Sequence, residues 1–248
     1  MISVHRFVDP AAVGRAAADL VDAAVLERGE RVIGLATGSS PLETYAELVR
    51  RHGGDATSAY RDVEAFLLDE YIGLPSDHPQ RYAAVIRREF TDAMGIPSGR
   101  VHGPDADAVD LAEASRAYDR TIERSGGVGV QLLGLGSDGH IAFNAPGTSF
   151  DERTHVATLG GSTRRDNARF FGGDIDAVPR SALSQGIATI LRARSIVVIA
   201  TGAGKAHIVA QVLASGPTEA LPATALHGHD DVVLLVDAAA GVLLEGHG

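Results

Sequence analysis

The sequence predicts an α/β fold: a doubly wound, mostly parallel, Rossmann-like sheet with helices on both faces. Short apolar runs rich in valine, isoleucine and leucine alternate along the chain with longer amphipathic segments. This alternation is typical of strands buried between two layers of helices. No linker rich in proline, glycine and serine divides the 248 residues, and no repeat is visible, so we expect a single domain over 1–248.

Five strands and five helices are expected from these patterns. The apolar runs are short and bounded by glycine or acidic residues, which indicates strands at 32–36, 65–68, 128–135, 195–200 and 231–236. Apolar residues recur with helical spacing at 9–28, 41–51, 81–90, 111–124 and 204–214. The glycine-rich stretch 160–173 is either part of a mobile lid, 160–182, or an ordinary surface loop.

Composition and charge exclude several classes of function. Hydrophobic residues are 45% and charged residues 22% of the chain, as in soluble globular proteins. The formal charge of −10 argues against nucleic acid as the main partner, because phosphate backbones attract basic surfaces, but it allows a local pocket for a small anion. The absence of cysteine excludes disulfides and thiolate catalysis. We expect no signal peptide, no membrane span and a cytoplasmic location.

A turn after the first expected strand has the composition of an anion site. Thr37, Gly38, Ser39 and Ser40 follow the strand, and Pro41 comes next. Serine is favoured as a helix cap and proline at the first helical position. The free N–H groups of a helix N-terminus suit a phosphate. The pattern therefore fits a phosphate site or, alternatively, a plain strand–helix turn capped by serine.

Two cations are candidates to complete such a site. Lys205 ends a second glycine turn, which follows the expected strand at 195–200 and begins a helix. A lysine early in a helix is opposed by the helix dipole, so it either serves a ligand or is simply solvated. Arg169 lies between apolar residues of the glycine-rich segment, either as a phosphate clamp or with its stem packed on the core.

Asp69 follows the apolar run at 65–68 and is expected at the carboxyl end of that strand. Ligands bind beyond the carboxyl ends of strands in open α/β sheets. Partial desolvation there would raise the pKa of Asp69 and make it a better proton acceptor. The alternative is a turn carboxylate that caps Tyr71 or Ile72.

The stretch GLGSDGHIAFNAPG, residues 134–147, places Asp138 and His140 in a glycine-rich turn. It matches G-x-G-x-x-G, but no second strand ending in an acid follows at the spacing that a dinucleotide site requires, so we expect no cofactor. A nearby carboxylate can orient a histidine and raise its basicity, which predicts acid–base chemistry. His140 has no spaced histidine or cysteine partner, so no metal is expected. The other histidine pair, His227 and His229, is interpreted as part of a surface loop.

Five motifs occur in the order seen in glucosamine-6-phosphate deaminases. They are LATGSSP, LLDEYIGLPSDHPQRY, GLGSDGHIAFNAPG, NARFFGG and ATGAGKA, and together they span nearly the whole chain. The related 6-phosphogluconolactonases share the fold and a D-G-H turn, but they typically have an arginine after the D-E pair, where this chain has Tyr71. The chain therefore resembles the deaminases more closely.

The resemblance implies a cofactor-free isomerisation of glucosamine 6-phosphate, coupled to loss of the amine, that yields fructose 6-phosphate and ammonia. By matching motif positions, Asp69 would move a proton between C2 and C1, and His140 would assist ring opening with Asp138 as its partner. The residues that would hold the phosphate are Gly38, Ser39, Ser40, Arg169 and Lys205. The expected partner is a small amino-sugar phosphate, and a homo-oligomer is compatible with the sequence.

One position departs from the family pattern. The family usually has F-N-E-P, whereas this chain has Ala145 in place of the glutamate. That glutamate normally completes the histidine's network, so ring opening would be slow, another group would substitute for it, or the substrate would differ. The alternatives are therefore an isomerase or lactonase on another phosphosugar, or a sugar-phosphate sensor with weakened catalysis.

Overall fold

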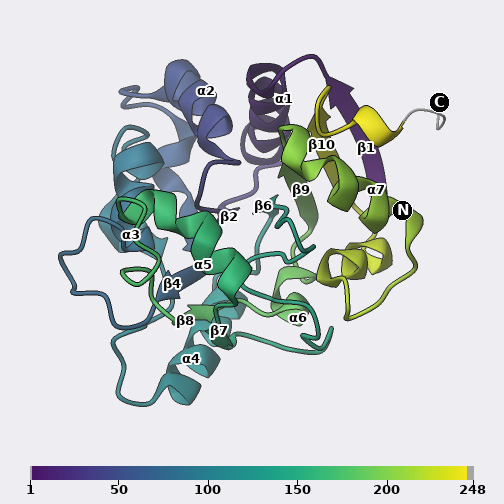
Figure 1. Ribbon diagram of the computed structural model, residues 1–248. Helices are drawn as coiled ribbons and strands as arrows, with labels where there is room; N and C mark the ends of the chain where they lie inside the picture. The colour runs from purple at the N-terminus through teal and green to yellow at the C-terminus, as the bar shows by residue number, and fades with distance from the viewer. Residues whose placement is uncertain (1, 245–248) are drawn as a thin grey trace.

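A seven-stranded, all-parallel sheet forms the centre of the computed structural model, which describes residues 2–244 (Figure 1). Its order is β1–β10–β9–β6–β2–β3–β5. The strands are β1 (Ile2–Phe7), β2 (Val32–Leu35), β3 (Glu64–Leu67), β5 (Val101–His102), β6 (Val130–Gly134), β9 (Ser195–Ala200) and β10 (Val232–Asp237). A smaller antiparallel sheet joins β4 (Asp69–Tyr71), β8 (Ser181–Ser184) and β7 (His155–Thr158). The predicted α/β fold is confirmed.

Each of the five expected helices is present. They are α1 (Pro10–Asp22), α2 (Leu42–His52), α3 (Tyr82–Ile86), α4 (Leu111–Arg124) and α7 (Ala206–Ala214). Helix α1 packs on α2 and on β1, β9 and β10, whereas α4 packs on β7 of the small sheet. Among residues 2–244, none of the helices combines the length and the apolar character that a membrane crossing requires.

The glycine-rich segment is helical, which corrects the surface-loop alternative. Helix α5 (Gly161–Asn167) and the 3₁₀ turn η5 (Ala168–Phe171) occupy it, and a short helix, α6 (Ile187–Ile190), follows β8. Glycine is concentrated at the two ends: Gly160 is the N-cap of α5, and Gly172, with φ of 66°, ends η5. A left-handed residue after a helix favours glycine, so the composition reflects the ends of a helix.

The start of α2 differs from the expectation. The helix begins at Leu42, and Pro41 is its N-cap, with no side chain capping the turn. Ser40 is therefore not the cap, and Pro41 is not the first helical residue. The hydroxyls of the turn at 37–40 are left available for another role.

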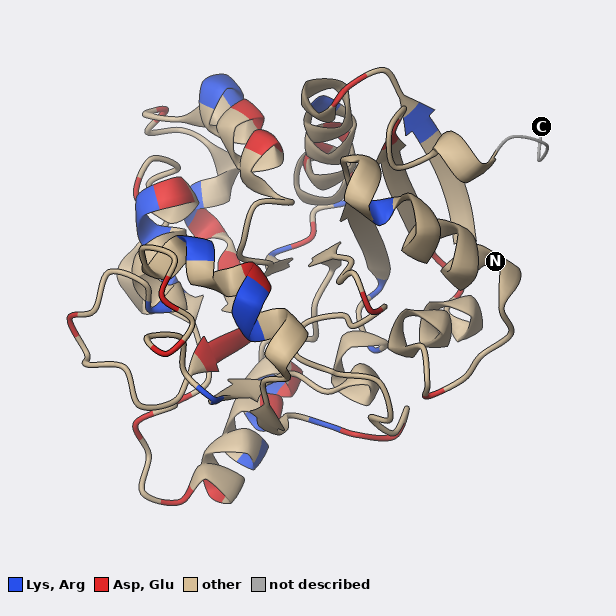
Figure 2. Ribbon diagram, in the orientation of Figure 1, with Lys and Arg blue, Asp and Glu red and all other residues tan. Residues whose placement is uncertain are grey.

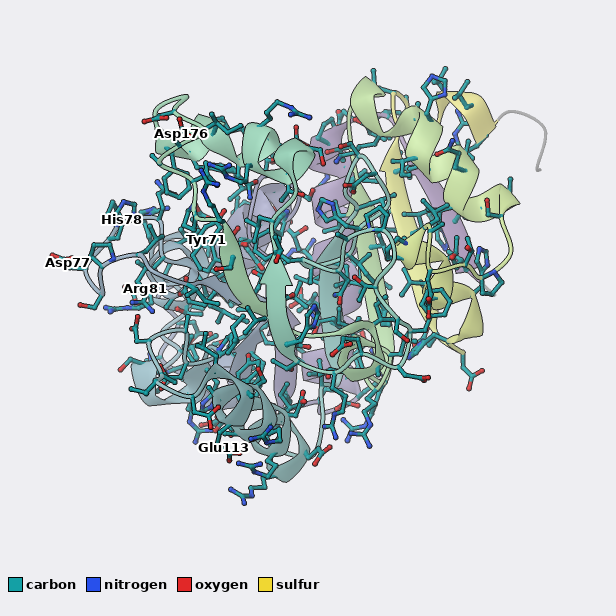
Figure 3. The ribbon with its side chains drawn as sticks, turned by 60° about the horizontal axis from the view of Figure 1, so that its bottom comes forward. Tyr71, Asp77, His78, Arg81, Glu113 and Asp176 are labelled. Carbon is teal, nitrogen blue, oxygen red and sulfur yellow. The ribbon has the colours of Figure 1, made fainter. Side chains whose placement is uncertain are left out.

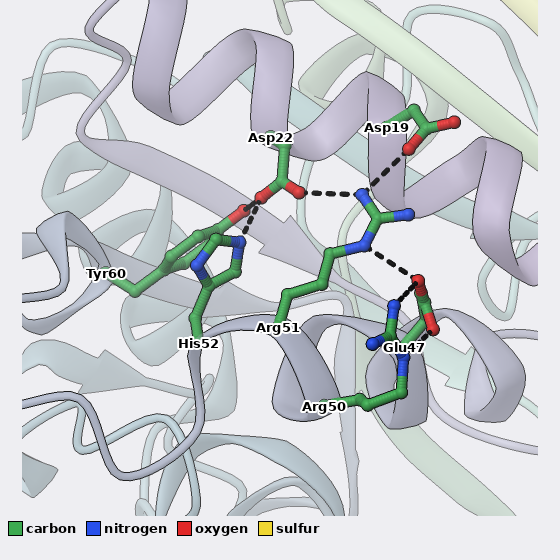
Figure 4. Close-up of polar contacts among 7 residues, drawn as sticks. All are labelled: Asp19, Asp22, Glu47, Arg50, Arg51, His52 and Tyr60. Atoms are coloured by element: carbon green, nitrogen blue, oxygen red, sulfur yellow. Dashed lines mark hydrogen bonds and ion pairs between the residues drawn. The ribbon is translucent and has the colours of Figure 1, made fainter.

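A cluster of ionic and polar side chains ties α1 to α2 (Figure 4). The Asp22 carboxylate accepts hydrogen bonds from Arg51, at 2.8 Å, and from the buried Tyr60, at 2.7 Å, and it also contacts His52. Its members are Asp19, Asp22, Glu47, Arg50, Arg51, His52 and Tyr60. Because α1 and α2 each follow a strand and run back along the sheet, this cluster lies toward the amino ends of the strands, away from the turns that follow β2 and β6.

The order of the strands reverses next to β2. From β2 the chain builds outward through β3 to β5, then returns to place β6 on the other side of β2 and continues through β9 to β10. The turns that leave β2 and β6 therefore diverge to opposite faces, which opens a crevice at their carboxyl ends. Crevices of this kind are where open α/β sheets bind their ligands.

Candidate active site

The crevice is a cavity of about 410 Å³. The turns after β2, β3, β6 and β9 contribute to its walls, together with α5 and η5. Residues predicted from the sequence that line it are Gly38, Ser39, Ser40, Asp69, His140, Arg169 and Lys205. Asp138, the remaining predicted residue, lies behind His140 and is hydrogen-bonded to it. The structure thus brings all eight predicted site residues together, from segments far apart in the sequence.

One end of the cavity has the character of an anion site. Gly38 has φ of 86°, a conformation that strongly favours glycine, and the hydroxyls of Ser39 and Ser40 flank it. Arg169 donates a hydrogen bond from Nη2 to Ser39 Oγ at 3.1 Å. Its guanidinium carbon also lies 4.8 Å from the centre of the Phe170 ring, so η5 holds this cation against the serine turn.

Lys205 is the second cation of that end, and it is half-buried. Burial lowers its pKa, while the negative charges of Asp166 and Asp138 act in the opposite direction. The turn before it depends on Asp237 at the end of β10, because both carboxylate oxygens accept the Gly202 N–H, at 3.0 and 3.1 Å. Asp237 is 3% exposed and also accepts the Ala240 N–H at 2.7 Å.

Asp69 begins strand β4 directly after Leu68 and is only 5% exposed. Burial, reinforced by the charge of Glu70, raises its pKa well above the ordinary value. The capping role considered for it belongs to Glu70, which accepts the N–H groups of Tyr71, Tyr82 and Ala83 at 2.9 to 3.0 Å. Within residues 2–244 no donor lies at hydrogen-bond distance from the Asp69 carboxylate, so it is free to act on a ligand.

Asp138 and His140 form a tightly coupled pair. His140 Nδ1 lies 2.5 Å from Asp138 Oδ1. The hydrogen bond with His140 lowers the pKa of Asp138 to about 2, so this carboxylate is ionised and Nδ1 is the donor. The other ring nitrogen, Nε2, is then the acceptor available to the cavity.

The local backbone explains why this turn is rich in glycine. A Cβ atom at Gly136 would collide with the His140 ring, which lies over that backbone. Gly139 has φ of 83°, and Ala142 has φ of 50°, a left-handed conformation that is strained for alanine. Strain of this kind is concentrated at functional sites, and Ala142 lines the cavity.

Three further cavity residues, Tyr82, Asp166 and Asn167, were missed by the sequence reasoning. The Tyr82 hydroxyl donates to the Tyr71 hydroxyl at 2.9 Å, and Asn167 Nδ2 of α5 donates to that same oxygen at 2.9 Å. Tyr71 is buried inside the molecule (Figure 3). Its hydroxyl connects α5 to Tyr82. In the sequence, Tyr82 is indistinguishable from an ordinary core tyrosine, and Asp166 and Asn167 are indistinguishable from polar residues on the surface of a helix.

Ala145 is half-buried and does not line the cavity. Its carbonyl accepts two hydrogen bonds from Thr148. Asp151 and Glu152, the nearest acids in sequence, are exposed and also lie outside the lining. Among the residues that the structure describes, Asp69 and Asp166 are the only acids that line the cavity.

The second histidine pair serves the fold, although not as a surface loop. His227 and His229 are half-buried at the end of a 3₁₀ helix, η7 (Pro222–Gly228). Their Nε2 atoms lie 2.8 Å from the Val212 carbonyl and 2.7 Å from the Ala193 carbonyl. Both rings therefore secure neighbouring backbone outside the cavity.

Comparison with known proteins gives consistent results. The chain is 49% identical over 237 residues to a glucosamine-6-phosphate deaminase of Beutenbergia cavernae, and the aligned region covers 96% of this chain and 90% of the relative. It is 50% identical over 229 residues to a glucosamine-6-phosphate deaminase of an Arthrobacter species, and the aligned region covers 92% of this chain and 87% of that relative. A solved structure of a monomeric glucosamine-6-phosphate deaminase superposes with a TM-score of 0.93 at 38% identity, covering 98% of this chain and 100% of that one.

The wider relationship includes lactonases. The 6-phosphogluconolactonase of Trypanosoma brucei has a TM-score of 0.76 at 23% identity, covering 98% of this chain and 99% of that one, which shows a shared fold. A family model described as glucosamine-6-phosphate isomerases/6-phosphogluconolactonase matches residues 10–234. These residues include each of the eight predicted site residues. The chain belongs to the glucosamine-6-phosphate isomerase/6-phosphogluconolactonase family.

Proposed function

We propose that this chain converts glucosamine 6-phosphate and water into fructose 6-phosphate and ammonia. One observation carries the proposal: a buried carboxylate, Asp69, and His140, which is hydrogen-bonded to Asp138, border the same cavity as the cations Arg169 and Lys205. A sugar phosphate that undergoes proton transfers requires both parts. The deaminases that resemble the chain over most of its length support this substrate and reaction.

The phosphate would bind at the end of the cavity formed by the turn at 37–40, Arg169 and Lys205. Backbone N–H groups of the turn and the hydroxyls of Ser39 and Ser40 supply directed donors, and the two cations balance the charge of the monoester. Anchoring the phosphate there would fix the distance from C6 to the reacting carbons. Binding energy from this remote group is then available to orient C1 and C2.

His140 would open the pyranose ring. Its Nε2 accepts the proton of the C1 hydroxyl as the C1–O5 bond breaks and returns that proton to O5, which leaves an open-chain aldehyde. The ionised Asp138 stabilises the imidazolium that forms, because it holds the Nδ1 proton at short distance. Neither group is consumed.

Asp69 would then move the hydrogen. It removes the proton from C2 while the C1 carbonyl oxygen takes one from the ammonium group at C2, giving an enolamine, and it returns its proton to C1, giving a protonated imine at C2. Water adds to C2 and ammonia leaves, which gives the ketone. A raised pKa suits this cycle because Asp69 must both accept and donate. In its net reaction the enzyme is a hydrolase of the C–N bond.

The test is an assay of ammonia and ketose phosphate on purified protein, with glucosamine 6-phosphate, galactosamine 6-phosphate and unphosphorylated glucosamine as substrates. We expect turnover of a phosphorylated amino sugar and a decrease of about a hundredfold to ten-thousandfold in Asp69→Asn. Asp151→Asn, an exposed carboxylate outside the cavity, is the matched control. Absence of ammonia, or equal ammonia from Asp69→Asn, would refute the proposal.

The proposal includes two further expectations from the sequence. The lid assigned to 160–182 would cover the bound sugar, since α5 and η5 already contribute Asp166, Asn167 and Arg169 to the cavity wall. The cytoplasmic location expected for the chain belongs to the same proposal.

A further inference from the structure

Asp166 is a cavity carboxylate with no part in the reaction described above. It lies near the end of α5 and lines the cavity with an exposed side chain. Helix α5 carries charges of both signs next to one another (Figure 2), and Asp166 is the acid that faces the site. A carboxylate at the phosphate end of an anion site is unfavourable for the ligand, so its presence requires an explanation.

The contacts of Asp166 place it in the cavity wall beside Ser137 and near Lys205. Ser137, which precedes Asp138, donates a hydrogen bond from Oγ to Asp166 Oδ2 at 3.3 Å. Arg169 is one helical turn further along the same segment. Lys205 lies close enough that the charge of Asp166 favours the protonated form of the lysine and raises its pKa against the effect of burial. Asp166 therefore offsets part of the positive charge of Lys205 before a ligand arrives.

We propose that Asp166 is a specificity-determining residue that weakens the binding of anionic sugar phosphates at this site. An incoming phosphate dianion must share Lys205 with a fixed negative charge that lines the same cavity. This inference rests on the proposed function only in taking a sugar phosphate as the ligand.

The charge of Asp166 acts differently on the two sides of the reaction. An amino-sugar phosphate carries an ammonium group that offsets one charge of its phosphate, whereas the ketose product carries the phosphate charge alone. A fixed carboxylate therefore opposes the product more strongly than the substrate. Asp166 limits product inhibition and discriminates against phosphosugars that lack an amine.

The experiment measures the Kd of inorganic phosphate and of fructose 6-phosphate by titration calorimetry. Asp166→Asn removes the charge but keeps an oxygen that can accept the Ser137 hydroxyl. We expect Kd to fall about threefold to tenfold in this variant at low salt, and the difference to shrink at 0.5 M salt, roughly the concentration at which exposed charges are screened. Asp174→Asn, an exposed carboxylate of the same segment outside the cavity lining, is expected to leave Kd unchanged.

Ser137→Ala distinguishes the effect of the Asp166 charge from that of its hydrogen bond, because this variant removes the hydrogen bond and retains the carboxylate. It is expected to show no tightening. An unchanged or weaker Kd in Asp166→Asn, or equal tightening in Ser137→Ala, would overturn the inference, and so would a wild-type protein that binds neither ligand. Phosphate binding that responds to Asp166→Asn without any release of ammonia would instead refute the proposed function alone.

Discussion

Asp237 offers a test that links the stability of the fold to the binding of phosphate. The carboxylate lies at the end of β10 and supports the turn that presents Lys205. Substitution by alanine removes the acceptor for two backbone N–H groups, those of Gly202 and Ala240. The bond to Gly202 shapes the phosphate end of the cavity. The bond to Ala240 satisfies a backbone N–H of a fully buried residue.

The magnitude follows from these two bonds. A hydrogen bond to a charged group contributes about 1.5 to 3 kcal/mol, and a buried donor left without a partner incurs its full desolvation penalty. Ala240 is completely buried, whereas Gly202 is half-buried and can be solvated. We therefore expect Asp237→Ala to lower the free energy of unfolding by about 3 kcal/mol, which for a chain of this size lowers Tm by roughly 6 to 12 °C.

Urea unfolding followed by circular dichroism measures the stability, and ammonia release as a function of sugar phosphate concentration measures KM. KM is expected to rise about tenfold with a smaller change in kcat, because the loss affects binding at the phosphate end. Asp231→Ala, an exposed acid just before the same strand, is the control and should change stability by less than about 0.5 kcal/mol. Normal stability in Asp237→Ala, or a loss of stability with an unchanged KM, would refute the reasoning.

Three further predictions concern Asp69 and the segment that follows His140. Burial raises the pKa of Asp69 above that of the unfolded chain, so this carboxyl lowers stability increasingly as the pH rises above the ordinary aspartate value. Asp69→Asn should therefore raise Tm at pH 7, and a gain that failed to shrink as the pH falls toward the ordinary aspartate value would contradict this. Ala142→Gly should relieve left-handed strain and leave the free energy of unfolding within about 0.5 kcal/mol of wild type. The control, Ala117→Gly inside α4, should lower it by about 1 kcal/mol. Equal losses of stability in the two variants, measured by urea unfolding, would argue against strain at Ala142. Ala145→Glu is expected to raise turnover of glucosamine 6-phosphate, and a lower or unchanged kcat would show that Ala145 does not weaken the activity.

The central strands of the sheet were predictable because burial on both faces leaves a continuous apolar run. Strand β9 is buried at all six positions and β2 at all four. Strand β1 was missed because it is an edge strand with exposed polar positions. The three residues of β4 include two acids, and only its antiparallel pairing with β8 makes it a strand.

The site was predictable where the reactive side chains and the glycines that shape their turn lie in one short stretch of sequence, as around Asp138 and His140. It was not predictable where a residue reaches the cavity through tertiary packing. Asp166 and Asn167 belong to a helix in a segment whose glycines predicted a loop or lid, and Tyr82 is positioned by the Glu70 carboxylate, which binds the start of α3. The serine turn lines the cavity, as a phosphate site there would require, but the prediction of a serine cap was wrong because Pro41 occupies the cap.

The reversal of strand order beside β2 has a consequence for how the protein is made. The cavity takes one wall from the turn after β2 and another from Lys205, after β9, so a chain released early from the ribosome holds only fragments of the pocket. Recovery of turnover during refolding would thus require the docking of β9 against β6 and not only the appearance of the first helices.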